Sequence, residues 1–206
     1  MSHKIKNSGQ GQIFSNPYLE VFSKSPPQVS AGFYTLIVLG LLFIAFKLQV
    51  VASIGTAVLI FIGAVLFWTL FEYFAHRYLF HLDDYFPNSK FAEKLAFTFH
   101  GIHHEYPRDV QRIIMPPAPG LIFSAVLFGL FFLIMGKYVF IFMPGFLTGY
   151  LIYTRIHYLT HTKNVPSYLR SQYKHHSLHH YKHTDMLFGV TTSFWDRVFG
   201  TMPPAK

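Results

Sequence analysis

Four long apolar stretches constrain this chain more than any other feature of its sequence. They cover residues 31–50, 50–71, 116–136 and 138–154, and the second and third contain no formally charged side chain. About 20 apolar residues in a helix are enough to cross the hydrocarbon core of a bilayer. A soluble protein would need a large polar remainder to cover such helices, but only 13% of this chain is charged. We therefore expect an all-α integral membrane protein with four transmembrane helices.

Short connections around Lys47 and Lys137 predict two hairpins, which leaves three longer segments on the other side of the membrane: residues 1–28, 72–115 and 155–206. These segments hold all nine Asp and Glu and, apart from Lys47 and Lys137, all 17 Lys and Arg. An excess of Lys and Arg marks cytoplasmic loops. We therefore expect a helical cap and both termini in the cytoplasm. The net charge of +8 then favours contact with an anionic bilayer surface, and no nucleic acid partner.

Residues 88–104 predict a helix of this cap. Asn88 or Ser89 is suited to cap it, and Phe91, Leu95 and Phe99 recur every four residues. This apolar face indicates either a helix that lies on the lipid surface or one that packs against the rest of the cap.

Histidine is the second unusual feature, with 13 residues in the chain. Ten form four motifs just beyond the second and fourth apolar stretches: His76 and His81; His100, His103 and His104; His157 and His161; His176, His179 and His180. Helix positions i, i+3 and i+4 share a face, so we expect each H-x-x-H-H triplet to aim its three rings at one point. Imidazole is the commonest metal ligand among side chains. Ten rings are too many for one ion and predict two metal ions, each with about four ligands, and two rings left over.

The use of histidine ligands, and their position at one end of the apolar bundle, limit which metals and reactions are expected. The chain has no Cys, and nitrogen ligands suit zinc, iron, copper or nickel. A site at the mouth of an apolar bundle lets a lipid acyl chain enter from the bilayer, which favours oxidation by O₂ over hydrolysis. The affinity order of these metals does not favour iron over zinc, so the ion found after purification can differ from the ion used for chemistry. Iron for activity, with zinc possible as purified, is our hypothesis. Metal transport or storage is the remote alternative, because transport predicts polar ligands near the bilayer centre, where these stretches carry none.

Five further residues are candidates for supporting roles. Tyr153 lies one turn before His157 and is expected to contact the substrate or the activated oxygen, or to be an ordinary interfacial tyrosine. Glu72 precedes His76 by one turn and is expected to orient it by accepting its free N–H. Asp196 is expected to orient a histidine or to cap local structure. His175 and His183 flank the last triplet and are expected to surround the ligand rings.

These motifs together resemble the fatty acid hydroxylase superfamily of membrane di-metal enzymes, and most closely the fatty acid 2-hydroxylases. The resemblance covers most of the chain. It is carried by E-Y-F-A-H-R and F-H (72–81), H-G-I-H-H with M-P-P (100–117), G-Y, Y, H-Y and H (149–161), and the H-H pairs with F-G-V-T, F-W-D and F-G-T (175–201). Thr154 stands where many relatives carry Asp.

The resemblance implies a single hydroxylase domain over residues 1–206, with the ten motif histidines lining a di-metal centre. It implies O₂, an external electron donor, and a hydroxyl group placed on C2 of a fatty acyl chain, free or in ceramide or dihydroceramide. Some relatives carry a cytochrome b5 domain, for which the residues before the first span are too few. We therefore expect a separate cytochrome b5- or ferredoxin-like partner. Related enzymes that act on sterols, carotenoids or ether lipids share the histidine motifs and are the alternative.

Overall fold

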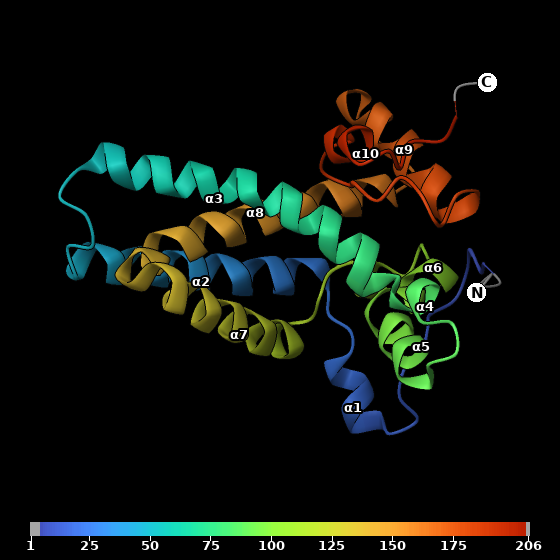
Figure 1. Ribbon diagram of the computed structural model, residues 1–206. Coiled ribbons are helices and arrows are strands. Elements are labelled where there is room, and N and C mark those ends of the chain that lie inside the picture. The colour runs from blue at the N-terminus through green and yellow to red at the C-terminus, as the bar shows by residue number, and fades with distance from the viewer. Residues whose placement is uncertain (1–4, 205–206) are drawn as a thin grey trace.

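The described part of the chain is an elongated helical bundle with a helical cap at one end (Figure 1). The computed structural model describes residues 5–204, so His3 and the two chain ends lie outside the described residues. No strand occurs between residues 5 and 204. The bundle consists of α2 (Pro27–Lys47), α3 (Ile54–Phe74), α7 (Pro117–Met135) and α8 (Val139–Thr160). The expectation of an all-α protein is confirmed.

The ends of these helices follow from residues with special backbone conformations. Proline occupies the first position of both α2 and α7, where its fixed φ suits a helix and its missing N–H is not needed. Gly136, with φ of 56°, ends α7 and begins the short turn η4 (Gly136–Tyr138). The hairpin between α2 and α3 covers residues 48–53 and is longer than expected, because Gln49 adopts a positive φ and α3 begins only after Ser53.

Helix α8 is the centre of the bundle. Its Met143 and Phe146 are buried in one cluster with Tyr34 of α2 and Trp68 of α3. Gly145 lets α8 approach α3 closely, since a Cβ at this position would lie 2.3 Å from the carbonyl oxygen of Phe61. Pairwise contact of α8 with α2, α3 and α7 fixes the four helices relative to one another.

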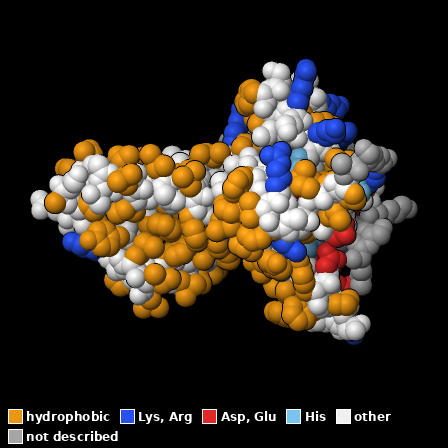
Figure 2. Space-filling view, turned by 45° about the horizontal axis from the view of Figure 1, so that its top comes forward, with side chains coloured by type: hydrophobic (Ala, Val, Ile, Leu, Met, Phe, Trp, Pro, Cys, Tyr) orange, Lys and Arg blue, Asp and Glu red, His pale blue; other side chains and the backbone are white. Residues whose placement is uncertain are grey.

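The outer surface of the bundle is also apolar. Leu59 of α3 is 74% exposed and Leu133 of α7 is 82% exposed. Three helical stretches within the described residues are long and apolar enough to cross a membrane: Pro27–Lys47, Ile54–Phe80 and Val110–Thr160, the last of which contains both α7 and α8. Figure 2 shows hydrophobic side chains over the bundle and most of the charged side chains on the cap. These features identify an integral membrane protein.

The cap is assembled from short helices that follow α3 and α8 and precede α2. They are α1 (Pro17–Phe22), η1 (Ala75–Phe80), α4 (Leu82–Tyr85), α5 (Lys90–Ala96), η2 (Phe97–Gly101), α6 (Ile102–Glu105), η3 (Val110–Arg112), η5 (Ser167–Leu169), α9 (Arg170–Tyr181) and α10 (Phe194–Val198). The predicted helix over residues 88–104 is confirmed, and it consists of three consecutive helical segments, α5, η2 and α6. Ser89 caps it, because its hydroxyl accepts from the Ala92 N–H at 3.2 Å.

Candidate metal centre

The ten motif histidines converge in the cap and form two groups of five. We call them group A and group B. Group A contains His76, His81, His100, His104 and His179, and group B contains His103, His157, His161, His176 and His180. One ring nitrogen of each member lies within 4.8 Å of those of all other members of its group. The two groups adjoin where the rings of His104 and His180 stack at a centroid distance of 4.2 Å.

Each H-x-x-H-H triplet is divided between the two groups, so the expectation that a triplet aims at one point is wrong. The reason is helical geometry. At about 100° per residue, i and i+4 lie about 40° apart, whereas i+3 and i+4 lie about 100° apart. His100 and His104 therefore point into group A and His103 into group B, while in α9 His176 and His180 point into group B and His179 into group A. The sequence predicted about four histidines for each ion and two further rings, whereas the structure divides the ten histidines into two groups of five.

Two π-helical turns place the motifs of the first half of the chain. His76 lies in the π-helix η1, and His81 follows its last residue. A π-helix pairs residue i with i+5, so the rings of His76 and His81 both reach group A. In a regular α-helix, side chains five residues apart would point in different directions. The second π-helix, η2, carries His100 into the same group. The chain leaves helical geometry at His81, directly after η1.

The nitrogen atoms are spaced as ligands around an ion would be. In group A, the His100 Nε2 atom lies 2.9 Å from the Nε2 atoms of both His76 and His104. In group B, the His176 Nε2 atom lies 2.9 Å from that of His161 and 3.0 Å from that of His180. Two ligands at about 2.1 Å from one ion and at right angles are about 3.0 Å apart. Both groups therefore fit a metal ion.

Burial keeps these rings in the form that binds metal. Nine of the ten are buried and His161 is half-buried. In the cap, loss of hydration lowers the pKa of His100, His103, His104, His161, His176 and His180 well below 6.5, and neighbouring rings lower it further. The pKa of His179 falls to about 3 for the same reasons. Neutral imidazole offers a lone pair to a metal, so the site is ready for ligation at neutral pH.

A loop at residues 186–191 orients two rings of group A through its backbone. The Nδ1 atom of His179 lies 2.7 Å from the Met186 carbonyl oxygen, and the Nδ1 atom of His76 bonds to the Phe188 carbonyl oxygen. Donation from Nδ1 leaves Nε2 free as the ligand atom. The sequence marks this loop through its F-G-V-T motif, but a backbone carbonyl partner leaves no side-chain pattern to find.

Asp196 holds that loop in place and has no exposed surface. It accepts from the backbone N–H groups of Phe188 and Gly189 at 2.8 and 2.9 Å, from the Thr201 hydroxyl at 2.8 Å, and from His175 Nε2 at 3.0 Å. Asp196 therefore both orients a histidine, His175, and caps local structure. His175 supports the loop indirectly, through its bond to Asp196. His183 is half-buried, and the hydrogen bonds found for it within residues 5–204 are backbone bonds to Leu178 and Met186, so its place beside the ligand rings stays a prediction.

Glu72 does not contact His76, so the prediction that it orients this ring is wrong. The Phe188 carbonyl takes that place. Glu72 instead accepts from the N–H groups of Val190 and Thr191 at 2.6 and 2.8 Å and from the Thr191 hydroxyl. It supports the metal centre from α3 by fixing the far end of the same loop.

Tyr153 lies against group B, as its position one turn before His157 predicts. Its hydroxyl is 3.3 Å from His157 Nδ1, and it lines the two apolar cavities that lead to the metal centre. Its neighbour Thr154 is buried and donates to the Leu151 carbonyl at 2.9 Å.

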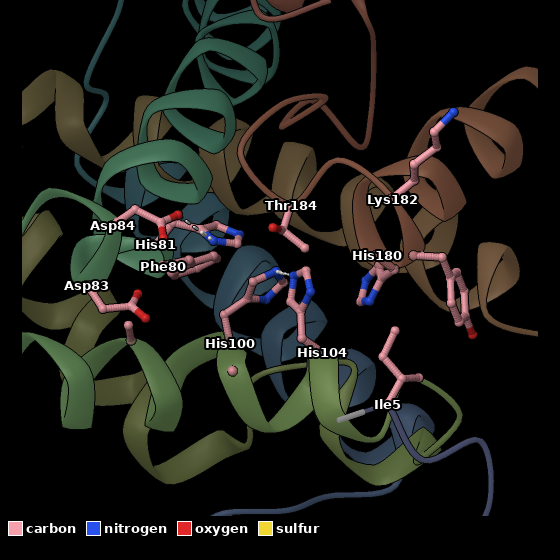
Figure 3. Close-up of a pocket in the computed structure, with 13 residues that line it drawn as sticks. Ile5, Phe80, His81, Asp83, Asp84, His100, His104, His180, Lys182 and Thr184 are labelled. Atoms are coloured by element: carbon pink, nitrogen blue, oxygen red, sulfur yellow. Dashed lines mark hydrogen bonds and ion pairs between the residues drawn. The ribbon is translucent and has the colours of Figure 1, made fainter. Parts of the chain in front are cut away.

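Among the cavities lined by residues 5–204, three reach the histidines. One lies within the bundle between α2, α3, α7 and α8 and reaches His76. A larger apolar one, about 1260 Å³ with its open mouth, lies between α1, α6 and the start of α7 and reaches His100, His103 and His157. The third is more polar and is lined by four of the ligand histidines together with Asp83, Asp84 and Lys182 (Figure 3). The centre is thus open to apolar and to polar molecules by different routes.

Comparison with known proteins agrees with this geometry. The family model described as fatty acid hydroxylase matches residues 60–201. The chain is 35% identical over 202 residues to the "Ceramide very long chain fatty acid hydroxylase scs7" of Schizosaccharomyces pombe, covering 97% of this chain and 57% of that protein. It is 36% identical over 150 residues to the "Fatty acid 2-hydroxylase" of Rattus norvegicus, covering 71% of this chain and 40% of that protein.

A solved structure gives the same result. It is "Full length scs7p (only hydroxylase domain visible)", with a TM-score of 0.85 and 35% identity over 95% of this chain and 74% of that one. The curated relatives named above are longer than this chain, which spans about half of their length. The expected resemblance is confirmed, and the chain belongs to the fatty acid hydroxylase family.

Proposed function

We propose that this protein is an O₂-dependent hydroxylase that places a hydroxyl group on C2 of a fatty acyl chain, free or within ceramide or dihydroceramide. The observation that carries the proposal is the pair of five-histidine groups at the inner end of apolar cavities. The relatives' names state this class of reaction and substrate. Bound metal would supply the redox chemistry that O₂ activation requires, and iron is the expected ion.

The chain's own residues have distinct tasks in this proposal. Five histidines would hold each ion, and the 186–191 loop orients His76 and His179. The Tyr153 hydroxyl lies beside His157 at the cavity wall, where it can bind the polar end of a lipid. The apolar lining excludes water from the alkyl chain. Electrons come from a separate cytochrome b5- or ferredoxin-like protein, and the polar cavity offers the route for that exchange.

The proposed membrane arrangement has four spans, α2, α3, α7 and α8, with the cap and both termini in the cytoplasm. The bias of Lys and Arg toward the cap supports this orientation. The proposed domain organisation is one hydroxylase domain over residues 1–206.

Lipid mass spectrometry tests the function. The protein is expressed in cells that lack 2-hydroxylated lipids, together with an electron donor and isotope-labelled O₂. We expect acyl chains with one labelled oxygen at C2, and none from the matched variant His104→Ala. Labelled sterols, carotenoids or ether lipids in their place would favour a related family activity. Unchanged lipids from a metal-loaded, donor-supplied protein would reject the proposal.

A further inference from the structure

The segment before the first span forms one wall of the largest apolar cavity at the metal centre. We call residues 11–23 the N-terminal strap. Its side chains Ile13, Phe14, Leu19 and Phe22 line the cavity, whose inner end is formed by His100, His103 and His157. This cavity therefore touches both metal groups, whereas the cavity within the bundle reaches only His76 of group A. The strap lies outside the match to the family model, which begins at residue 60.

A buried ion pair fixes the strap to the cap. Glu20 accepts from the N–H groups of Ile13 and Phe14 at 3.1 and 2.9 Å and pairs with the guanidinium group of Arg112. Arg112 also donates from Nε to the Gly11 carbonyl at 2.9 Å and from Nη1 to the Ser23 carbonyl at 3.2 Å. Both charged residues are buried. The strap is thus a fixed wall and not a loose terminal segment.

The same bonds leave the cavity suited to an alkyl chain. Arg112 is the sole Lys or Arg of the described lining, and all three of its nitrogens are bonded to the strap. It therefore offers no free charge to an anionic head group. The remaining wall is largely aliphatic and aromatic, and Ile13 and Phe14 are half-buried within it.

The mouth of the cavity opens at the surface that lipid would cover. Leu19 and Phe22 of α1 are 52% and 60% exposed on one side of it. Ile122 of α7, one of the apolar spanning helices, is 69% exposed on the other. A lipid chain can therefore pass from the bilayer between α1 and α7 to both metal groups, with the strap along its path.

We propose that the N-terminal strap selects the acyl chain, with Ile13 and Phe14 as specificity-determining residues. This inference rests on the proposed function. The volume of these two side chains sets the width of the path that an alkyl chain follows beside the strap. Removing the Phe14 ring widens this path, and enlarging Ile13 narrows it.

The test is a competition between straight-chain acyl substrates and methyl-branched ones of equal length, presented as an equimolar mixture in lipid vesicles to the metal-loaded protein. For Phe14→Ala, we expect the ratio of branched to straight 2-hydroxy products to rise about tenfold, since one extra methylene-sized group in an apolar pocket is worth at least that discrimination. For Ile13→Phe, we expect the ratio to fall by a similar factor. Tyr18→Ala is the matched control, because Tyr18 lies on the same strap, is 80% exposed and does not line the cavity.

The product ratio is independent of how much of each variant is folded, so partial misfolding does not disturb the test. Equal ratios in wild type, Phe14→Ala and Ile13→Phe would overturn the inference, and so would changes of the same sign in both variants. Failure of the wild-type protein to form any 2-hydroxy product would instead reject the proposed function. Metal content, measured in parallel, is expected to stay unchanged in all three variants, because none of these residues belongs to group A or group B.

Discussion

Replacing Asp196 by Asn is expected to weaken metal binding by group A and to leave metal binding by group B unchanged. Each carboxylate oxygen of Asp196 accepts two bonds: Oδ1 from Phe188 N–H and the Thr201 hydroxyl, and Oδ2 from Gly189 N–H and His175. Burial alone would raise the pKa of Asp196, but the bonds from His175, Thr201 and Gly189 lower it below its usual value. The wild-type side chain is therefore ionised at neutral pH.

The size of the effect follows from the number of bonds lost. Asn keeps one acceptor oxygen, so two of the four donors lose their partner in a site with no solvent access. At about 1.5 kcal/mol for each hydrogen bond to a charged group, the loop loses about 3 kcal/mol. That loop orients His76 and His179, both of group A, through its carbonyl groups. Loss of such outer contacts typically weakens metal binding 10- to 100-fold.

Metal content after dialysis against a chelator measures this effect. We expect about two ions per chain in the wild type and about one in Asp196→Asn, with the loss confined to group A. Asp185→Asn is the matched control, since Asp185 lies in the same region but is exposed. Retention of both ions by Asp196→Asn, or equal loss from both groups, would refute the reasoning.

Three further predictions follow from the site and the strap. His104→Ala is expected to deplete metal from group A and His103→Ala from group B, although the two residues are adjacent. Each variant then keeps one ion, in a different group, so the spectra of the remaining ion should differ between the variants. Identical spectra would contradict the assignment. Tyr153→Phe removes the hydroxyl 3.3 Å from His157 and is expected to lower turnover about 10-fold or more with unchanged metal content, as measured by parallel kinetics and metal analysis. The pKa of Glu20 is lowered because its hydrogen bonds and its guanidinium partner outweigh the opposing effect of burial, so its stabilisation of the strap is full above about pH 4.5 and is lost as the pH falls through the lower folded value. The protection factors of residues 11–23 in hydrogen exchange should therefore fall only in acid, and protection that does not change with pH would count against this role.

The bundle was predictable because its helices are apolar in composition and bounded by residues with clear backbone preferences. Pro27 and Pro117 begin α2 and α7, and Gly136 ends α7. The longer hairpin at residues 48–53 was not predictable, since a positive φ at Gln49 has no strong sequence signature.

The convergence of the ten histidines was predictable from their spacing, but their division into two groups was predicted wrongly. The required signal is present in the sequence, because i and i+4 lie closer in angle than i+3 and i+4 on any helix. The role assigned to Glu72 failed for a different reason. The backbone carbonyl of Phe188 accepts the hydrogen bond from His76 that was assigned to Glu72. No side-chain pattern in the sequence reveals that a carbonyl of a distant loop takes this place.

The most direct test of the metal centre is X-ray diffraction from crystals of the purified metal-loaded protein, measured on both sides of the absorption edge of the bound metal. The two five-histidine groups predict two anomalous difference peaks, one enclosed by the Nε2 atoms around His100 and one by those around His176. A single peak shared by both groups, or full metal content with no peak beside these rings, would contradict a centre built from two sets of five.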